Sequence, residues 1–417
     1  MIRSITIGVP IFNLSKAELS HSLSGFRVHA EQSSKIFNLA VRTTRLTLPA
    51  PRLNHDVNSG MLYSVINTVR DLAKDANARW YCLPINLFSE GENEGFLDEV
   101  QTLLIKDSQL FVNLICATKQ KISISGAQYA SRFILDLARR GNNGIDNFRV
   151  GVSAACSAGT PFFPFSRHEG KNLSFSIALE TTPLVLSLAM QARKESWSLS
   201  EFQYQLIQQL SDLMSRAQEF AHHLSVEAGI DYSGLDASLA PFPDGKTSVA
   251  SIIEAMGPKP VGSHGTVFMT SILTDAIKLA AKKSNISLVG FNGVMFSVLE
   301  DNILAEANNL RALTLEKLAL FSTVCGCGID MVPVPSTMFS EDISSLILDI
   351  SALAVRLNKP LGVRLLPIPN KDVNEYTQLN LDFLCDSRVM SPGIGGSYRL
   401  LEDSTWCYGS ERLKGEL

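Results

Sequence analysis

The most constraining feature of this sequence is the regular alternation of short apolar runs with longer segments of helical periodicity. In the first half of the chain, four apolar runs of strand length are each followed by an amphipathic segment. The pairs are 4–10 with 16–38, 41–48 with 60–75, 80–85 with 94–106, and 110–116 with 126–140. Apolar strands that alternate with helices are typical of a buried sheet. We therefore predict an α/β fold.

The second half of the chain continues the pattern without an evident boundary. Apolar runs at 148–155, 173–180 and 361–366 predict strands, and helical periodicity covers 198–228, 247–256, 265–283, 300–321 and 341–357. No Ser/Gly or Pro linker, charge block or low-complexity tract divides the 417 residues, 45% of which are hydrophobic. We predict one domain over residues 1–417, with an irregular tail from about 391.

Composition and charge exclude several functional classes. The net charge is −4 and the Lys and Arg residues are scattered, so nucleic acid is not expected as a partner. No apolar run is long enough to span a bilayer, and residues 1–8 are typical of a strand rather than of a secretory signal. Seven cysteines, an odd number, do not suggest a disulfide framework. We predict a cytoplasmic protein without a membrane partner.

A loop with two thiols is the strongest candidate for chemistry. Cys325 and Cys327 lie between a helical segment and an apolar strand, and Asp330 lies on that strand. The glycines at 326 and 328 allow close approach of a ligand to the backbone, so either thiol, and Cys325 first, is a candidate nucleophile. The alternative is that Cys325 is a small buried residue in a tight turn. A Cys-x-Cys unit without a second cysteine or histidine pair predicts no zinc site.

Other loops contribute polar groups that could act with this thiol. His168 follows a rigid Phe-Pro loop and would suit a thiol as general acid or base. Asp236 and Ser238 share another loop, where the carboxylate could move protons or form a local turn. Glu180 ends an apolar strand, so its charge must be paired or bound by a ligand. Candidate anion-binding side chains, which could equally pair with Glu180, are Arg42, Arg45 and Arg364.

Several segments together resemble one known family, domain of unknown function 711, also called uncharacterised protein family 0210. The segments that carry this resemblance occur in order along most of the chain. They are 41–46 (Val-Arg-Thr-Thr-Arg-Leu), 161–180 (beginning Pro-Phe-Phe-Pro), 235–241, 248–257, 265–266, 290–295, 299–301, 325–335 and 364–369.

The resemblance implies a ten-stranded α/β barrel of the pyruvate formate-lyase-like type, related also to ribonucleotide reductase. It further implies a homodimer and an inner loop that carries a cysteine at its tip, for which Cys325 or Cys327 is the counterpart. The glycyl-radical enzymes of that fold require glycine in an Arg-Val-x-Gly segment. Here the segment is Arg388-Val389-Met390-Ser391, so serine replaces the glycine and a non-radical reaction is expected.

The sequence thus leads to a thiol-dependent enzyme acting on a small carboxylate- or carbonyl-containing metabolite. Cys325 would be the reactive thiol and His168 or Asp236 would move protons. One alternative is a metabolite-binding or regulatory protein without catalysis. A second is a metal-dependent hydrolase that uses Asp236, Glu180 and His168. The sequence specifies no cofactor.

Overall fold

The computed structural model describes residues 1–51, 60–88, 94–393 and 405–407, which form one large sheet surrounded by helices. Its strands are β1 (Ile2–Gly8), β2 (Thr44–Thr47), β3 (Ala78–Asn86), β4 (Leu110–Ala117), β5 (Lys121–Ser123), β6 (Val150–Ala154), β7 (Ser174–Leu179), β8 (Asp231–Asp236), β9 (Gly328–Pro335), β10 (Leu361–Ile368) and β11 (Thr405–Cys407). The α-helices are α1 (Lys16–Ile36), α2 (Leu62–Asp75), α3 (Glu94–Lys106), α4 (Ile124–Arg140), α5 (Thr182–Glu195), α6 (Leu199–Ala228), α7 (Val249–Ala255), α8 (Thr266–Lys283), α9 (Asn302–Asn309), α10 (Leu315–Phe321) and α11 (Ser340–Arg356). Two 3₁₀ helices are η1 (Ile145–Arg149) and η2 (Val298–Glu300).

The main sheet consists of two parallel groups of strands that run in opposite directions. The strand order is β8-β7-β1-β2-β3-β4-β6-β10-β9. Strands β1, β2, β3, β4 and β6 are mutually parallel, as are β7 with β8 and β9 with β10. The groups meet in antiparallel pairs, β1 with β7 and β6 with β10. The amino ends of the first group therefore lie at the same edge as the carboxyl ends of the second.

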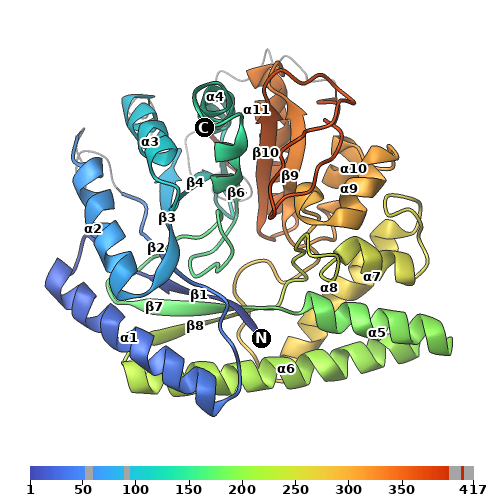
Figure 1. The fold of residues 1–417 in the computed structure, drawn as a ribbon, viewed down its shortest axis with the longest axis horizontal. Helices are drawn as coiled ribbons and strands as arrows, with labels where there is room; N and C mark the ends of the chain where they lie inside the picture. Colours follow the sequence, from blue (N-terminus) through green and yellow to red (C-terminus); the bar gives the residue numbers. More distant parts are fainter. Residues whose placement is uncertain (52–59, 89–93, 394–404, 408–417) are drawn as a thin grey trace, which may run out of the picture.

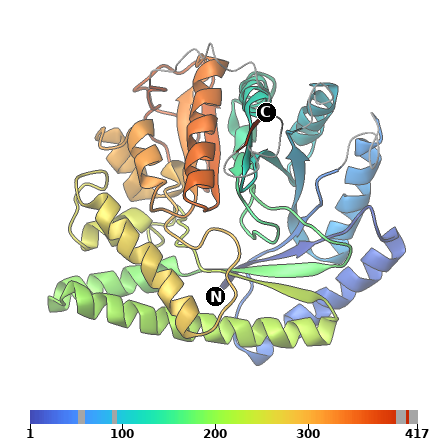
Figure 2. The same ribbon diagram turned by 180° about the vertical axis from the view of Figure 1, so that it is seen from behind.

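The sheet is strongly curled, and the helices cover its outer face (Figures 1 and 2). Helices α1 and α6 pack along the β1–β7–β8 side, whereas α4 and α11 pack on the β4–β6–β10 side. Helix α1 shows why the sequence folds this way locally. Ser15 and Glu18 form a reciprocal capping box at its start, and the apolar Leu19, Leu23 and Phe26 recur at helical spacing and are buried. The predicted α/β class is confirmed.

The closed ten-stranded barrel expected from the family resemblance is not confirmed. The two ends of the strand path, β8 and β9, are connected by the irregular segment 288–297, which makes isolated parallel bridges to β8 and to β9. Regular pairing is interrupted because Gly290 and Asn292 both have positive φ. The Asp236 carboxylate, rather than a strand carbonyl, accepts the backbone N–H groups of Phe291 and Asn292.

The loop at 155–173, between β6 and β7, lies inside the curled sheet. Its carbonyl groups accept hydrogen bonds from three strands, namely from Thr6 on β1 to Pro161 (2.9 Å), from Cys82 on β3 to Pro164 (3.3 Å) and from Asn113 on β4 to Ser166 (3.2 Å). A thiol was expected at the tip of such a loop. The tip carries Phe163, Pro164 and Phe165 instead, and Cys325 and Cys327 immediately precede β9.

Three local features differ from the predicted elements. The helix expected at 300–321 is divided into α9 and α10, because Arg311 has positive φ and Thr314 starts a new helix as its N-cap. Helix α5 and strand β8 were not predicted as separate elements. Most of the expected irregular tail falls outside the described residues. None of the helices in the described ranges is both long and apolar enough to cross a membrane.

The fit of the enclosed loop predicts a large stability cost for one added methyl group. A Cβ on Gly362 of β10 would lie 2.3 Å from Phe165 Cε1, so Gly362→Ala should lower the free energy of unfolding by about 1–3 kcal/mol. Gly25, inside α1, has nothing within 4 Å of its Cβ position. Gly25→Ala should therefore raise stability by up to about 1 kcal/mol. Urea denaturation measures both changes, and equal effects would contradict the packing of the loop.

Candidate functional site

A cavity of about 680 Å³ opens beside the amino ends of the first strand group and extends along β9 and β10 as far as Cys327, which precedes β9. One side is formed by residues that start β1, β2 and β3. The other side is formed by the segment after β8, the end of the 288–297 segment, β9 and β10. The cavity lies beyond the carboxyl end of β8, which is where ligands of open α/β sheets bind.

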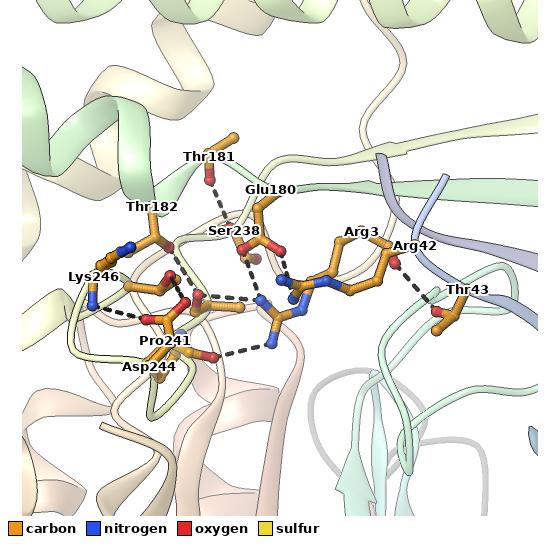
Figure 3. A network of polar contacts seen from close by, with 12 residues as sticks. Arg3, Arg42, Thr43, Glu180, Thr181, Thr182, Ser238, Pro241, Asp244 and Lys246 are labelled. Atoms are coloured by element: carbon orange, nitrogen blue, oxygen red, sulfur yellow. Dashed lines mark hydrogen bonds and ion pairs between the residues drawn. The ribbon is translucent and has the colours of Figure 1, made fainter. Parts of the chain in front are cut away.

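Arginines at the starts of three neighbouring strands line one side of the cavity. They are Arg3 on β1, Arg42 and Arg45 at β2, and Arg79 on β3. Arg3 and Arg42 hold opposite oxygens of Glu180, at 2.9 and 3.0 Å (Figure 3). Two of the four guanidinium groups are therefore paired with this carboxylate.

Arg45 is a buried cation without a hydrogen-bond acceptor. Its Nε has no partner, and no hydrogen bond or ion pair involves its guanidinium in the described part of the chain. The group instead lies over the rings of Trp80 and Phe163, with its Cζ 5.1 and 5.2 Å from their centroids. Burial, and then repulsion by Arg3 and Arg79, lowers the pKa of Arg45 to about 9.

Arg364 on β10 is the opposite case, because two carboxylates surround it. It donates to both oxygens of Asp330, at 2.6 and 3.0 Å, and to Glu300 at 2.6 Å. Burial opposes its charge, but Asp330 and Glu300 together raise the pKa of Arg364 above its ordinary value. Burial raises the pKa of Asp330, against the effect of Arg364. This side of the cavity has one more carboxylate than it has guanidinium groups.

Of the two thiols in the loop before β9, Cys327 lines the cavity and Cys325 lies behind it. A hydrogen bond from the Cys327 thiol lowers the pKa of Cys325 to about 6. Lys359 and the N–H of Gly328, 3.4 Å from the Cys325 sulfur, act in the same direction. The bond to Cys325, together with burial, raises the pKa of Cys327. These opposite shifts favour the negative charge on Cys325 and the proton on Cys327.

Asp236 and Ser238 hold the backbone together away from the cavity lining. The Asp236 carboxylate accepts from the Ser238 hydroxyl (2.6 Å) and from the N–H groups of Ser238, Phe291 and Asn292. A Cβ on Gly290 would lie 2.2 Å from Asp236 Oδ2. Burial raises the pKa of Asp236, while these bonds lower it. The carboxylate therefore fixes the irregular segment against β8.

His168 lies at the opposite edge of the sheet from the arginine side chains. Its ring packs against Gly8, the last residue of β1, and its backbone bridges Pro49 just beyond β2. Burial lowers the pKa of His168, so the ring is neutral at physiological pH. The cavity is instead at the start of β1, where Arg3 stands.

Four of the nine residues predicted from the sequence line this cavity. These are Arg42, Arg45, Asp330 and Arg364. Cys325 and Glu180 contact lining residues from behind, whereas Asp236, Ser238 and His168 are turned to other parts of the structure. Sequence reasoning missed Arg3, Arg79, Glu300 and Lys359. The position of arginines at the starts of successive predicted strands could have revealed the first two.

Comparison with known families now places the chain. A family described as "Uncharacterised ACR (DUF711)" matches residues 1–380. The chain belongs to this family. A UPF0210 protein from Caldicellulosiruptor saccharolyticus is 26% identical over 425 residues, which covers 96% of this chain and 92% of that protein. A UPF0210 protein from Pyrobaculum aerophilum is 37% identical over 173 residues, or 42% of this chain and 37% of that protein.

The extent of the match differs between relatives. A UPF0210 protein from Methanocaldococcus jannaschii is 28% identical over 290 residues, covering 68% of this chain and 62% of its own. The matches thus span less than two thirds of the length of this relative and of the one from Pyrobaculum aerophilum. Among solved structures, an anaerobic ribonucleotide reductase aligns with a TM-score of 0.43 at 10% identity, over 87% of this chain and 70% of that one.

The contrast between the two buried arginines predicts opposite effects on stability. Arg45→Met removes an unpaired buried cation, so it should leave the free energy of unfolding unchanged or raise it by about 1 kcal/mol. Arg364→Met leaves two carboxylates without their partner and should lower stability by about 3–5 kcal/mol. Urea denaturation of both variants in the absence of ligand measures this. Similar losses in the two variants would mean that Arg45 is also held by a carboxylate.

Proposed function

We propose that the chain is a thiol-dependent, non-radical enzyme that acts on a small metabolite carrying a carboxylate and a carbonyl group. The single observation that carries this proposal is the buried Arg45 guanidinium without an acceptor. A buried charge is costly unless it is paired, and a guanidinium matches a carboxylate in shape and in hydrogen-bond geometry. A ligand carboxylate would provide the missing acceptor.

The surrounding charges favour an anion at this position. Arg3, Arg42, Arg45 and Arg79 lie together, where Glu180 pairs with the first two and Glu300 attracts Arg45 without contact. The local excess of positive charge lowers the cost of desolvating a carboxylate there. Arg3 and Arg42 serve mainly to hold Glu180, so we assign the direct contact with the ligand to Arg45 and Arg79.

The thiol pair would provide the chemistry. As the Cys327 sulfur forms a bond to the carbonyl carbon, its proton passes to the Cys325 thiolate, and the carbonyl π electrons move onto oxygen. The product is the alkoxide of a tetrahedral thiohemiacetal, with the transferred proton on Cys325. Cys325 is the base in this step rather than the nucleophile, since Cys327 is the sulfur that lines the cavity. Lys359 would stabilise the initial thiolate, with its Nζ donating to the Cys325 carbonyl at 2.5 Å.

Binding without turnover is the second candidate. It is favoured by the placement of His168 and Asp236, the expected proton carriers, away from the cavity lining. The metal-dependent hydrolase has less support, because Asp236, Glu180 and His168 engage separate partners, and no cluster of three metal-ligating side chains occurs in the described ranges. A homodimer and a cytoplasmic location remain predictions.

Small molecules retained by the purified protein test the anion site. We expect mass spectrometry of denatured wild-type protein to reveal a carboxylate-containing metabolite. It should be absent from Arg45→Met, because that variant lacks the guanidinium that would donate to the carboxylate. Arg356→Met changes an exposed arginine on α11 and is the matched control, which should retain the metabolite. Retention by Arg45→Met at the wild-type level would reject the assignment.

Thiol alkylation as a function of pH tests the cysteine pair. Since the pKa of Cys325 is about 6, iodoacetamide should modify Cys327 at a rate that rises between pH 5 and 7 and then levels off. In Cys325→Ala the base is lost, so labelling at pH 7 should fall by about tenfold and require higher pH. Cys156→Ala removes another buried thiol as control. Peptide mass spectrometry identifies the labelled sulfur, and pH-independent protection of Cys327 until unfolding would favour binding without catalysis.

A further inference from the structure

We infer that the ligand of this cavity is an aromatic carboxylate, with its charged group at Arg45 and its ring directed toward Cys327. This inference rests on the proposed anion site and adds the chemical class of the ligand body. Nine aromatic side chains line the cavity, but the apolar non-aromatic lining consists of Ile145, Ala240, Pro241 and Met295. The cavity wall is therefore predominantly aromatic, which favours aromatic ligands over other apolar ligands.

The rings form two groups at different depths. Trp80 and Phe163 lie against Arg45, and Phe111 packs between them with its centroid 5.4 Å from each of the two rings. Phe165 and Phe291 form an edge-to-face pair at 5.5 Å and belong to the same buried cluster as Cys327. Tilted and perpendicular pairs present both ring faces and ring edges, which are the surfaces that attract a further aromatic ring.

The charges define the orientation of the ligand. A carboxylate near Arg364 would meet Asp330 and Glu300, whose combined charge already exceeds that of their arginine. A carboxylate at Arg45 meets Glu300 only at longer range, and the charges of Arg3, Arg79 and Arg42 outnumber it there. The ligand body must then extend from Arg45 across the cavity, which brings its other end to Phe165, Phe291 and Cys327.

The size of the cavity is consistent with such a ligand. A volume of about 680 Å³ lies within the range of small-molecule sites, roughly 300–1,000 Å³. A rigid planar ligand loses little conformational freedom on binding, so it can contact many rings at a low entropic cost. A flexible aliphatic chain would fit the volume but would gain neither stacking nor edge-to-face contacts.

Three probes of nearly equal size separate the two parts of the inference. Isothermal titration of the full chain with 3-phenylpropanoate, 3-cyclohexylpropanoate and 3-phenylpropanamide compares an aromatic acid, its saturated analogue and its neutral analogue. We expect the aromatic acid to bind about 5–10-fold more tightly than the cyclohexyl acid, although the latter is the more hydrophobic. It should bind at least about tenfold more tightly than the amide, because the amide cannot pair with Arg45.

The outcomes distinguish this inference from the function on which it rests. If the cyclohexyl acid binds as tightly as the aromatic acid and the amide binds weakly, the anion site stands and the aromatic assignment is overturned. If acid and amide bind alike, or none of the three binds at millimolar concentration, both proposals fail.

A variant on the cavity wall provides an independent check. Phe291→Leu should weaken 3-phenylpropanoate about 3–10-fold and change the cyclohexyl acid less than about twofold, because the aromatic contact is lost but apolar area remains. Phe383→Leu, at a partly exposed lining position, serves if the first variant does not fold. Equal weakening of both acids would overturn the aromatic assignment.

Discussion

The opposite directions of the two parallel strand groups determine the position of the candidate binding cavity. Because β1 pairs antiparallel with β7, and β6 with β10, the amino ends of one group face the carboxyl ends of the other at a single edge. Arg3, Arg45 and Arg79 stand at the first set of ends, whereas Asp330 and Arg364 lie within β9 and β10. The enclosed 155–173 loop fills the interior and leaves a cavity at that edge, with Phe163 and Phe165 as part of its wall.

The buried charges that line the cavity are unequally paired, so its two ends differ in their preference for an anion. Arg364 has two carboxylates, whereas Arg45 has aromatic faces and no acceptor. Cation–π contacts compensate in part, by about 1–2 kcal/mol when the pair is desolvated, which is less than the cost of burying an unpaired guanidinium. A methionine at position 45 would cover the same rings without that cost. Under the proposed function, the cation at this position is kept for a ligand at the expense of stability.

The sequence predicted the local structure better than the site, for physical reasons. Alternating apolar runs and amphipathic segments depend on neighbours along the chain, so the α/β class and most element positions followed from them. The replacement of regular pairing by the Asp236 carboxylate depends on residues about 55 positions apart and could not be read locally. The arginines at the strand starts were readable, since parallel strands bring like ends together. Pairing of Glu300 with Arg364 required the tertiary structure, because an acidic residue near a helix start has a sufficient local explanation.

The thiol pair illustrates why a single candidate cysteine was too simple a description. The N–H of Gly326 donates to the Val294 carbonyl at 2.7 Å, which fixes the loop so that Cys327 lines the cavity and Cys325 is buried behind it. Lys359 contacts the Cys325 carbonyl and does not line the cavity, which favours the negative charge on Cys325 and the proton on Cys327. In the proposed reaction, the Cys327 nucleophile has its base beside it. It therefore needs no histidine, and the position of His168 at the opposite edge of the sheet is compatible with thiol chemistry.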